Sequence, residues 1–438
     1  MKPIDPLPDD VLLSIFKFHV HSDLASQSET AWQSLVHVCR RWRSLVFGSP
    51  GHLDLRLVCT TRTPVRDALD IWPSLPLVIV CEGRLGENVD NIIAGLECTD
   101  RVRGALFRVA RNSDLEMILA AMQQPLPKLR SLRIELNDKI GTAAFVPDSI
   151  LGGSAPRLEF LALKNVLYPG LLKLLFFTTH LVDLHLNGIP HSGYIPPDTM
   201  VTTLSMLTSL SALSLKFASP RSCPDRENRR PSPSTRSALS VLSHFYFGGV
   251  SEYLEDLVAC IDAPQLSNLH IIFFNDIVFD TPQLVQFIGR TPVLREPEKA
   301  HLTFWDSGVE ANFSRTPDYL FSGFHVRILC RGSDWQVSSL EQVCTSCLLP
   351  FSKLEDLYIH ENPVRRQDWK GCIENGLWLE LLQPFIAVKN LYLSEEFATR
   401  IGPALQELVG DRVTGVLPAL QNIFFGGAQG IGACRRGH

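Results

Sequence analysis

The chain has 438 residues, 45% of them hydrophobic and 20% charged, a composition typical of globular proteins with a large core. Its formal net charge of −5 lacks the positive excess that favours nucleic-acid binding, and its longest purely apolar runs fall far short of the roughly 20 residues of a membrane helix. We therefore expect protein partners, with no nucleic acid and no membrane.

The N-terminal stretch MKPIDPLPDD has neither the basic region nor the apolar core of a signal peptide. The cysteines are mostly set in apolar surroundings, as at Cys39, Cys81, Cys260 and Cys330, which favours buried thiols over a disulfide framework. We therefore expect a reducing compartment, cytoplasmic and/or nuclear.

Residues 7–50 predict three short helices. Pro8 suits the first turn of the first helix, which places on one face Leu12, Ile15, Phe16 and His19. The second, starting after Ser28 or Thr30, carries Trp32, Leu35, Val36 and Cys39. The third, ended by Gly48-Ser49-Pro50, carries Trp42, Leu45 and Val46. A unit this small has little stability alone, so we expect it to pack against something else.

From residue 75 the pattern alternates between strand and helix. Strands are predicted at 75–80, 104–110 and 129–136. A helix is predicted at 88–96, and Ser113 is predicted to cap another, whose apolar side comprises Leu115, Ile118, Leu119 and Met122. This alternation favours a parallel sheet backed by helices.

A phrase of apolar residues, L-x-x-L-x-L, recurs along the rest of the chain. The clear copies are LRSLRI (129–134), LEFLAL (158–163), LVDLHL (181–186), LSALSL (210–215) and LSNLHI (266–271). The weaker copies are LSHFYF (242–247), LEDLYI (354–359), VKNLYL (388–393) and LQNIFF (420–425). Copies start 23 to 34 residues apart, except between Leu266 and Leu354, where 299–304 and 324–329 are candidate degenerate copies. This spacing suits one strand and one helix per repeat, and predicts an α/β fold: an irregular leucine-rich-repeat-like β-α solenoid with a parallel sheet.

In each copy, the residue between the last two apolar positions points away from the core. These residues form an aromatic stripe: Arg133, Ala162, His185, Ser214, Tyr246, His270, Tyr358, Tyr392 and Phe424. Because tyrosine and arginine are favoured binding anchors, the tentative substrate-binding residues are Arg133, His185, Tyr246, His270, Tyr358 and Tyr392. The alternative is that neighbouring rings stack on one another and merely cover the strands.

Two segments lack the repeat pattern. Residues 219–237 contain four prolines, five arginines and no large apolar side chain, which predicts a loop or disordered insertion. Residues 426–438 predict a flexible tail.

The common catalytic signatures GxxxxGK[ST], GxGxxG, GxSxG and HExxH do not occur in the sequence. Cys344 and Cys347 form a CTSC pair, but no second pair completes a zinc site. Two candidate acid-base pairs, His185 with Asp183 and His360 with Glu361, fall on an exposed sheet face with no obvious nucleophile. We therefore predict no catalytic residue, no metal, no cofactor and no enzymatic activity.

The first fifty residues resemble the F-box. Its opening motif is matched by Leu7, Pro8, Asp10, Val11, Leu12, Ile15 and Phe16, and its closing Val-Cys-x-x-Trp motif by Val38, Cys39 and Trp42. With the following GSPGHLDLRLV, the pattern is similar to F-box proteins of mushroom-forming fungi. The remainder resembles leucine-rich-repeat proteins in general form. The implied domains are an F-box at 1–50 and a leucine-rich-repeat-like domain at 51–425.

The resemblance implies a function. F-box domains dock on a Skp-type adaptor, itself bound to a cullin, while the domain behind captures a protein substrate. The expected role is the substrate-recognition subunit of an SCF-type cullin ubiquitin ligase; the alternative is a non-catalytic interaction scaffold outside a ligase. The implied adaptor-binding residues are Leu7, Pro8, Leu12, Ile15, Phe16, Val38, Cys39 and Trp42. We expect at least half of them to hold the three helices together.

Overall fold

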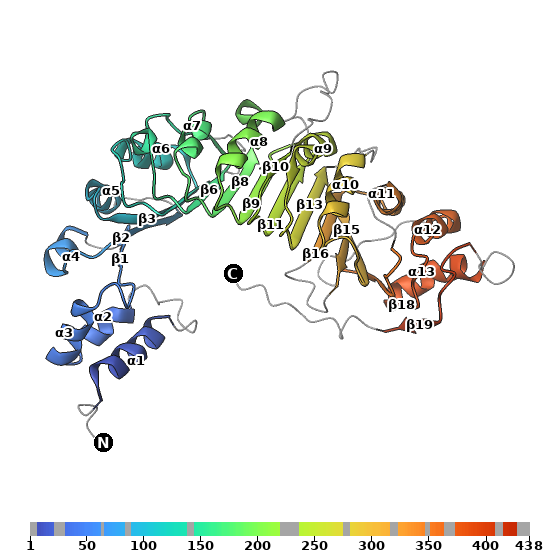
Figure 1. Ribbon diagram of the computed structural model, residues 1–438, viewed down its shortest axis with the longest axis horizontal. Helices are drawn as coiled ribbons and strands as arrows, with labels where there is room; N and C mark the ends of the chain where they lie inside the picture. Colours follow the sequence, from blue (N-terminus) through green and yellow to red (C-terminus); the bar gives the residue numbers. More distant parts are fainter. Residues whose placement is uncertain are drawn as a thin grey trace. The chain divides into compact units, whose positions relative to one another are not determined.

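The computed structural model divides the chain into two compact units, Met1–Leu181 and Val182–His438 (Figure 1). The structure describes residues 7–21, 31–62, 65–83, 89–137, 144–219, 236–274, 281–315, 323–346, 351–362, 373–407 and 415–426. Most of the predicted insertion, residues 220–235, and the predicted tail from residue 427 onward lie outside these ranges.

Three helices begin the first unit: α1 (Asp9–His21), α2 (Ala31–Val36) and α3 (Arg40–Gly48). Their buried core comprises Leu12, Phe16, Trp32, Leu35, Val36 and Val46, close to the predicted set. The assignment of Cys39 to the second helix is wrong, because α2 already ends at Val36. Cys39 instead caps α3, where its Sγ accepts a hydrogen bond from the Trp42 amide at 3.5 Å.

The three helices pack against the start of the repeat region. The Trp32 indole Nε1 donates a hydrogen bond to the Arg56 carbonyl oxygen at 2.9 Å. Its ring lies 5.1 Å from that of Trp72, which directly follows α4 (Val65–Ile71). The expectation that so small a unit needs support is therefore met within the same chain.

The sheet of the first unit has five parallel strands, ordered β1 (Leu57–Thr60), β2 (Leu77–Gly83), β3 (Val102–Val109), β4 (Ser131–Leu136) and β6 (Phe160–Lys164). The connections contain α4, α5 (Val89–Glu97), α6 (Asn112–Ala121) and the 3-10 turn η3 (Ile150–Gly153), and α7 (Leu171–Phe176) follows β6. Helices α5 and α6 lie on one face of the sheet (Figure 1). A separate pair joins β5 (Ala144–Phe145) to β7 (Val166–Leu167).

Helix α6 begins earlier than the sequence predicts. Its N-cap is Arg111, with no side-chain cap hydrogen bond, so Ser113 lies inside the first turn and the predicted cap is wrong. The predicted apolar side is nevertheless correct, since all four of its residues are buried. The spacing of apolar residues correctly predicted the buried face of the helix, whereas a single serine did not predict where the helix begins.

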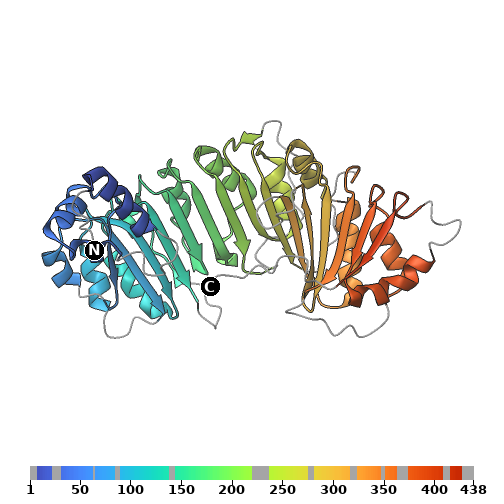
Figure 2. The ribbon, with the colours of Figure 1, turned by 90° about the horizontal axis from the view of Figure 1, so that it is seen from below.

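The second unit has ten strands in one sheet. Their order is β8 (Asp183–Ile189), β9 (Ala212–Phe217), β11 (His244–Gly249), β13 (Asn268–Phe274), β16 (Gly323–Leu329), β15 (Gly308–Ser314), β14 (Lys299–Trp305), β17 (Asp356–Glu361), β18 (Asn390–Leu393) and β19 (Asn422–Phe425). Figure 2 shows these strands side by side, from green β8 to red β19.

The helices of this unit lie between its strands in the chain. They are α8 (Pro197–Met206), α9 (Ser251–Ala259), α10 (Pro282–Arg290), α11 (Ser333–Ser346), α12 (Asn375–Leu382) and α13 (Glu395–Gln406), with the 3-10 turn η4 (His191–Gly193). Helices α8, α9 and α10 cover one face of the sheet (Figure 1). A short extra pair joins β10 (Ser237–Ala238) to β12 (Ile261–Asp262).

Strands β14, β15 and β16 explain the blurred repeat register between residues 272 and 353. They form an antiparallel meander that lies in the sheet in the reverse of its order in the chain. The last strand, β16, therefore pairs with β13, and the first, β14, pairs with β17. Only Asp306 and Ser307 separate β14 from β15, which leaves no room for a helix. The two candidate copies at 299–304 and 324–329 are therefore strands that run parallel to the others, with the antiparallel β15 between them.

The recurring leucine phrase forms the core of both sheets. In eight of its nine copies all three apolar positions are buried. The ninth is different, because Ile423 and Phe425 of β19 are exposed, and no helix follows β19 within the described residues. The predicted α/β fold, with N-terminal helices and a largely parallel repeat sheet, is confirmed.

Candidate functional site

The three N-terminal helices expose an apolar surface. Among the predicted adaptor-binding residues, Pro8, Ile15, Val38 and Cys39 are exposed, Leu7 and Trp42 are half-buried, and Leu12 and Phe16 are buried. The two buried residues contribute to the core of the three helices rather than to their surface. The solvent-facing residues of the set therefore come from the start and middle of α1 and from the turn before α3.

Sequence reasoning missed Phe18, whose side chain is 78% exposed and is the most exposed large apolar residue in the described part of the chain. With Val11 and Ile15 it follows the i, i+4, i+7 spacing that places side chains on one helix face. We call Val11, Ile15 and Phe18 the α1 stripe. The spacing was visible in DDVLLSIFKF, but the F-box motif does not extend to this phenylalanine.

The start of α1 is fixed to α3 by Arg41. Its guanidinium pairs with Asp9 Oδ1 at 2.7 Å and donates to the Leu7 carbonyl oxygen at 2.6 Å. The Pro8 carbonyl oxygen accepts from the Leu12 amide at 3.1 Å, which closes the first helical turn. Pro8 is thus held exposed at a well-defined helix start, beside the ion pair.

The predicted aromatic stripe is continuous across the second unit. Strand register places its side chains directly opposite one another, in the order His185, Ser214, Tyr246, His270, His325, Asn312, His301, Tyr358, Tyr392 and Phe424. Arg133 belongs to the first unit, where its row reads Val80, Leu106, Arg133 and Ala162. Five of the six tentative binding residues therefore share one row.

Most rings in this row stack. The ring centroids of Tyr358 lie 4.2 Å from those of both His301 and Tyr392, with interplanar angles of 8° and 7°. Tyr392 stacks on Phe424 at 4.7 Å, and His270 lies 4.8 Å from Tyr246. Stacking explains why the tyrosines are only half-exposed on an otherwise open face. These ring contacts within the sheet also stabilise the side-chain positions in the absence of a bound protein.

Three members of the row, His301, Asn312 and His325, were missed because the repeat register was blurred over the meander. A usable signal was present for two of them. His301 lies between the buried Ala300 and Leu302, and His325 lies between Phe324 and Val326, as the row position requires. Asn312 is on the antiparallel β15, which has no leucine phrase.

Glu310 is the charged centre of the meander's open face. Its Oε2 accepts hydrogen bonds from Arg327 Nη2 at 2.6 Å and from Nε at 3.0 Å, and His325 Nδ1 lies 3.8 Å from Oε1. Burial alone would raise the pKa of Glu310, but His325 and Arg327 outweigh it and lower the pKa to about 2. Glu310 is therefore a fixed anion at neutral pH.

Burial lowers the pKa of three histidines on this face, His270, His301 and His360. Burial lowers the pKa of His270 to about 4 and that of His301 to about 3, with further lowering from His325 and His360 respectively. Burial also lowers the pKa of His360, whose Nε2 lies 3.0 Å from the Thr303 hydroxyl. The pKa values of His270 and His301 lie well below the range that suits general acid-base work near pH 7.

The candidate acid-base pair of His360 with Glu361 is not formed. Successive strand residues point to opposite faces, and Glu361 lies 3.6 Å from Arg400 of α13 on the helix-covered side. Burial raises the pKa of Cys59, Cys81 and Cys330 to about 11, which makes their thiols poor nucleophiles.

Neither a metal site nor a membrane span is found within the described ranges. Histidine, cysteine and carboxylate side chains do not gather there in groups of three or more that could hold an ion. Cys344 is buried, whereas Cys347 of the CTSC pair lies outside the described residues. None of the described helices is long and apolar enough to span a bilayer.

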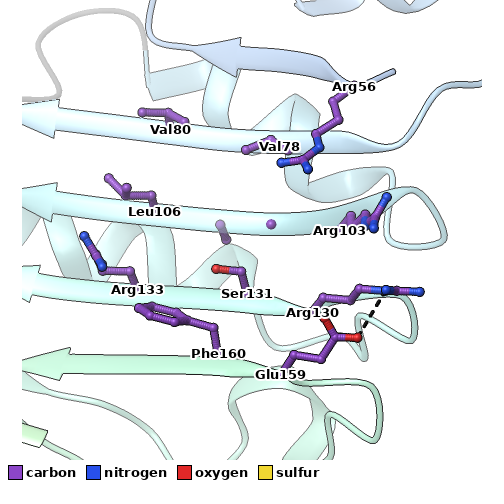
Figure 3. Close-up of a pocket in the computed structure, with 12 residues that line it drawn as sticks. Arg56, Val78, Val80, Arg103, Leu106, Arg130, Ser131, Arg133, Glu159 and Phe160 are labelled. Carbon is purple, nitrogen blue, oxygen red and sulfur yellow. Dashed lines mark ion pairs between the residues drawn. The ribbon is translucent and has the colours of Figure 1, made fainter. Parts of the chain in front are cut away.

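The first unit has a hollow on the open face of its sheet, with a volume of about 450 Å³ (Figure 3). Its floor consists of small and aliphatic side chains, and its rim is rich in arginine. Arg133, predicted as a binding residue, lies at this rim with its guanidinium 5.1 Å from the Phe160 ring centroid.

Comparison with known proteins identifies the N-terminal helices. Residues 4–50 match the family model described as F-box-like. The chain therefore carries an F-box-like domain at its N-terminus. This match covers the three helices and the α1 stripe. A search of curated proteins finds no match.

Two solved structures match the chain at low similarity. The chain is similar to the leucine-rich repeat-containing protein LegL7 from Legionella pneumophila, with 12% identity, 86% of this chain and 92% of that one covered, and a TM-score of 0.29. It is also similar to the chain in the TLR13–ssRNA13 complex, with 12% identity, coverages of 84% and 49%, and a TM-score of 0.28.

Proposed function

We propose that the protein is the substrate-recognition subunit of an SCF-type cullin ubiquitin ligase. In this proposal the F-box at residues 1–50 docks on a Skp-type adaptor and through it on a cullin. The repeat domain at 51–425 holds a protein target near the ubiquitin-charged enzyme and so raises its effective concentration. The chain itself performs no chemistry, in keeping with the lowered pKa of His270, His301 and His360 and the raised pKa of the buried thiols.

The observation that carries the proposal is the α1 stripe within an F-box-like domain. Ile15 is 47% exposed and Phe18 78% exposed, although full burial of each side chain would contribute roughly 1.5–3 kcal/mol. Contiguous exposed apolar side chains in a globular protein mark interaction surfaces. Pro8, Ile15, Val38 and Cys39 are proposed as direct adaptor contacts, with Phe18 and Val11 added, while Leu12, Phe16 and Trp42 hold the surface in shape.

The proposed target surface is the open face of the repeats. His185, Tyr246, His270, Tyr358 and Tyr392 form its row in the second unit. Their mutual stacking fixes the ring planes in advance, which lowers the entropic cost of binding a partner. The same stacking fits the simpler alternative of a self-supporting cover, so loss of a captured target on Tyr392→Ser would be needed to assign binding.

The test of adaptor docking is a change of Ile15→Asp together with Phe18→Asp in the full chain. Both side chains face solvent, so the helices should stay folded while a charge enters an apolar contact. We expect binding to a Skp-type adaptor, measured by calorimetry, to weaken at least about a hundredfold, equal to about 2.7 kcal/mol.

The matched control is Met117→Asp, since Met117 is an exposed apolar residue on α6 outside the F-box-like domain. It should bind the adaptor as the unmodified chain does. Equal binding by the double variant would refute the docking surface. Adaptor binding without recruitment of a cullin would instead favour a scaffold that acts outside a ligase.

A further inference from the structure

Positive charge is concentrated where the strands of the first unit begin. The hollow on this sheet adjoins a smaller one of about 160 Å³, and the two share Arg103 and Arg130. Together they are lined by seven cations: Arg56, Arg101, Arg103, Lys128, Arg130, Arg133 and Arg157. Glu159 is the only acidic lining residue in the part of the chain that the structure describes, although the chain as a whole carries a net charge of −5. We call this surface the arginine hollow.

Only part of this charge is neutralised within the protein. Arg103 pairs with Asp54 at 2.8 Å, and Asp54 also pairs with Arg56. Burial would raise the pKa of Asp54, but hydrogen bonds and charge from the two arginines outweigh it and lower the pKa. Arg130 pairs with Glu159 at 3.1 Å.

Three other cations of the hollow form no ion pair with a carboxylate of the described residues. Lys128 and Arg157 are exposed and have no carboxylate within ion-pair distance among the described residues. Within the described ranges, Arg101 donates to two backbone carbonyl oxygens, those of Leu75 at 3.1 Å and Pro73 at 3.4 Å, and to no carboxylate. A net positive charge therefore remains at the strand starts.

The floor of the hollow follows from strand register. One row crosses four strands as Val78, Gly104, Ser131 and Phe160, with the two smallest side chains in the middle. Figure 3 shows the guanidinium groups of Arg103 and Arg130 at the strand starts and Val78 and Ser131 farther along. Four strands span about 14 Å, the length of about four extended residues. The size and the apolar floor suit a peptide.

The same geometry is poorly suited to nucleic acid. Single-stranded nucleic acid binds where bases can stack on open aromatic faces. The one aromatic ring of the hollow, Phe160, is already covered by the Arg133 guanidinium. The remaining floor is aliphatic or small and gives bases nothing to stack on.

We propose that the arginine hollow binds an extended acidic segment of a protein target. Aspartate or glutamate carboxylates would pair with Lys128 and Arg157, which have no ion pair among the described residues, and the Arg157 guanidinium can bind a carboxylate with two parallel hydrogen bonds. An intervening apolar side chain would fill the space above Gly104 and Ser131. This inference rests on the proposed function only for the statement that the segment belongs to a target.

The test uses the full chain without adaptor and a fluorescent peptide of about twelve residues that alternates glutamates with leucine. Anisotropy should show binding that weakens with added salt, and a peptide with glutamine in place of glutamate should bind at least about tenfold more weakly. Lys128→Glu with Arg157→Glu should weaken binding of the acidic peptide by about tenfold or more.

The matched control is Arg66→Glu with Arg331→Glu, which changes the net charge equally at two exposed sites outside the hollow. It should bind as the unmodified chain does. Ser131→Leu should also weaken binding, because it fills the floor and leaves every charge in place. Unchanged thermal unfolding would show that each variant is folded.

Three outcomes would overturn the inference: equal affinity for the glutamate and glutamine peptides, equal weakening in the control variant, or stronger binding of a single-stranded RNA of matched charge. Adaptor binding is measured separately, and the Lys128 and Arg157 variant should retain it. Peptide binding without adaptor binding would remove the proposed function and leave the acidic-segment site standing.

Discussion

Glu310 fixes the position of charged side chains on the open face of the meander. It is a carboxylate on the open face of a sheet, held ionised by Arg327 and His325, whose Nδ1 lies 3.8 Å from Glu310 Oε1. Its charge fixes the Arg327 guanidinium, which also lies 5.2 Å from the Trp305 ring centroid. The meander therefore has a charged anchor where the repeat pattern is interrupted.

The pKa of Glu310 makes stability depend on pH. Because the folded-state pKa of about 2 lies below the ordinary value of 4.5, its stabilising contribution is complete above pH 4.5 and is lost as pH falls toward 2. We expect Glu310→Gln to lower the free energy of unfolding by about 1–3 kcal/mol at pH 7. Urea unfolding at pH 7 and at pH 3 should show the difference from the unmodified chain shrinking at the lower pH.

Glu296→Gln provides the control, since Glu296 pairs with Arg295, Arg315 and Lys353 at a partly exposed surface site. This variant should lower the free energy of unfolding far less, because surface ion pairs usually contribute little to stability. An effect of Glu310→Gln that is the same at both pH values would contradict the assigned role.

At the scale of elements, the meander depends on a tight turn between β14 and β15. Gly308 begins β15, and any side chain there would collide with the Ile328 carbonyl oxygen of the neighbouring strand. Backbone atoms cannot move aside as a flexible side chain can. The reversed strand order therefore requires glycine at this position.

We expect Gly308→Ala to destabilise the chain by about 1–3 kcal/mol, by forcing β15 away from β16. Gly376→Ala is the matched change, since nothing lies within 4 Å of a Cβ added there. Within α12 it should be neutral or stabilising by up to about 1 kcal/mol. Denaturant unfolding gives the free energy of unfolding of each variant. Equal values for Gly308→Ala and Gly376→Ala would refute the steric argument.

The elements also show what the sequence can and cannot predict. Alternation along a strand decides which face is buried, so Leu132 and Ile134 mark the core and Arg133 the open face from sequence alone. Strand direction is different, because β15 alternates like any other strand and only its partners show that it runs the opposite way. The arginine hollow was missed for the same reason: it exists only once four strands are in register.

At the scale of the whole molecule, the F-box-like domain is attached to the repeats through tryptophan. Trp32 is buried, hydrogen-bonded to the Arg56 carbonyl and in edge contact with the ring of Trp72. The Phe47 ring adds a contact 6.3 Å from that of Trp72. The three N-terminal helices are therefore held by contacts with Arg56 and with Trp72, which directly follows α4.

We expect Trp32→Ala to lower the stability of the three helices by about 3–5 kcal/mol, since it opens a cavity at this junction. Hydrogen exchange should show lost protection in α1 to α3 while β2 to β4 stay protected. Trp335→Ala is the control, because that indole is 64% exposed, and it should change neither region. Uniform loss of protection through both regions would show that the helices and the repeats unfold as one.

The alternation of buried and open positions along each strand has an evolutionary consequence. Within LRSLRI, selection on Leu132 and Ile134 preserves the fold, while Arg133 between them can vary without repacking the core. A lineage could therefore change the open face by point mutation, one row position at a time, while the F-box-like domain stays under separate selection. Divergence among descendants of this chain would then collect on the open face and spare the leucines.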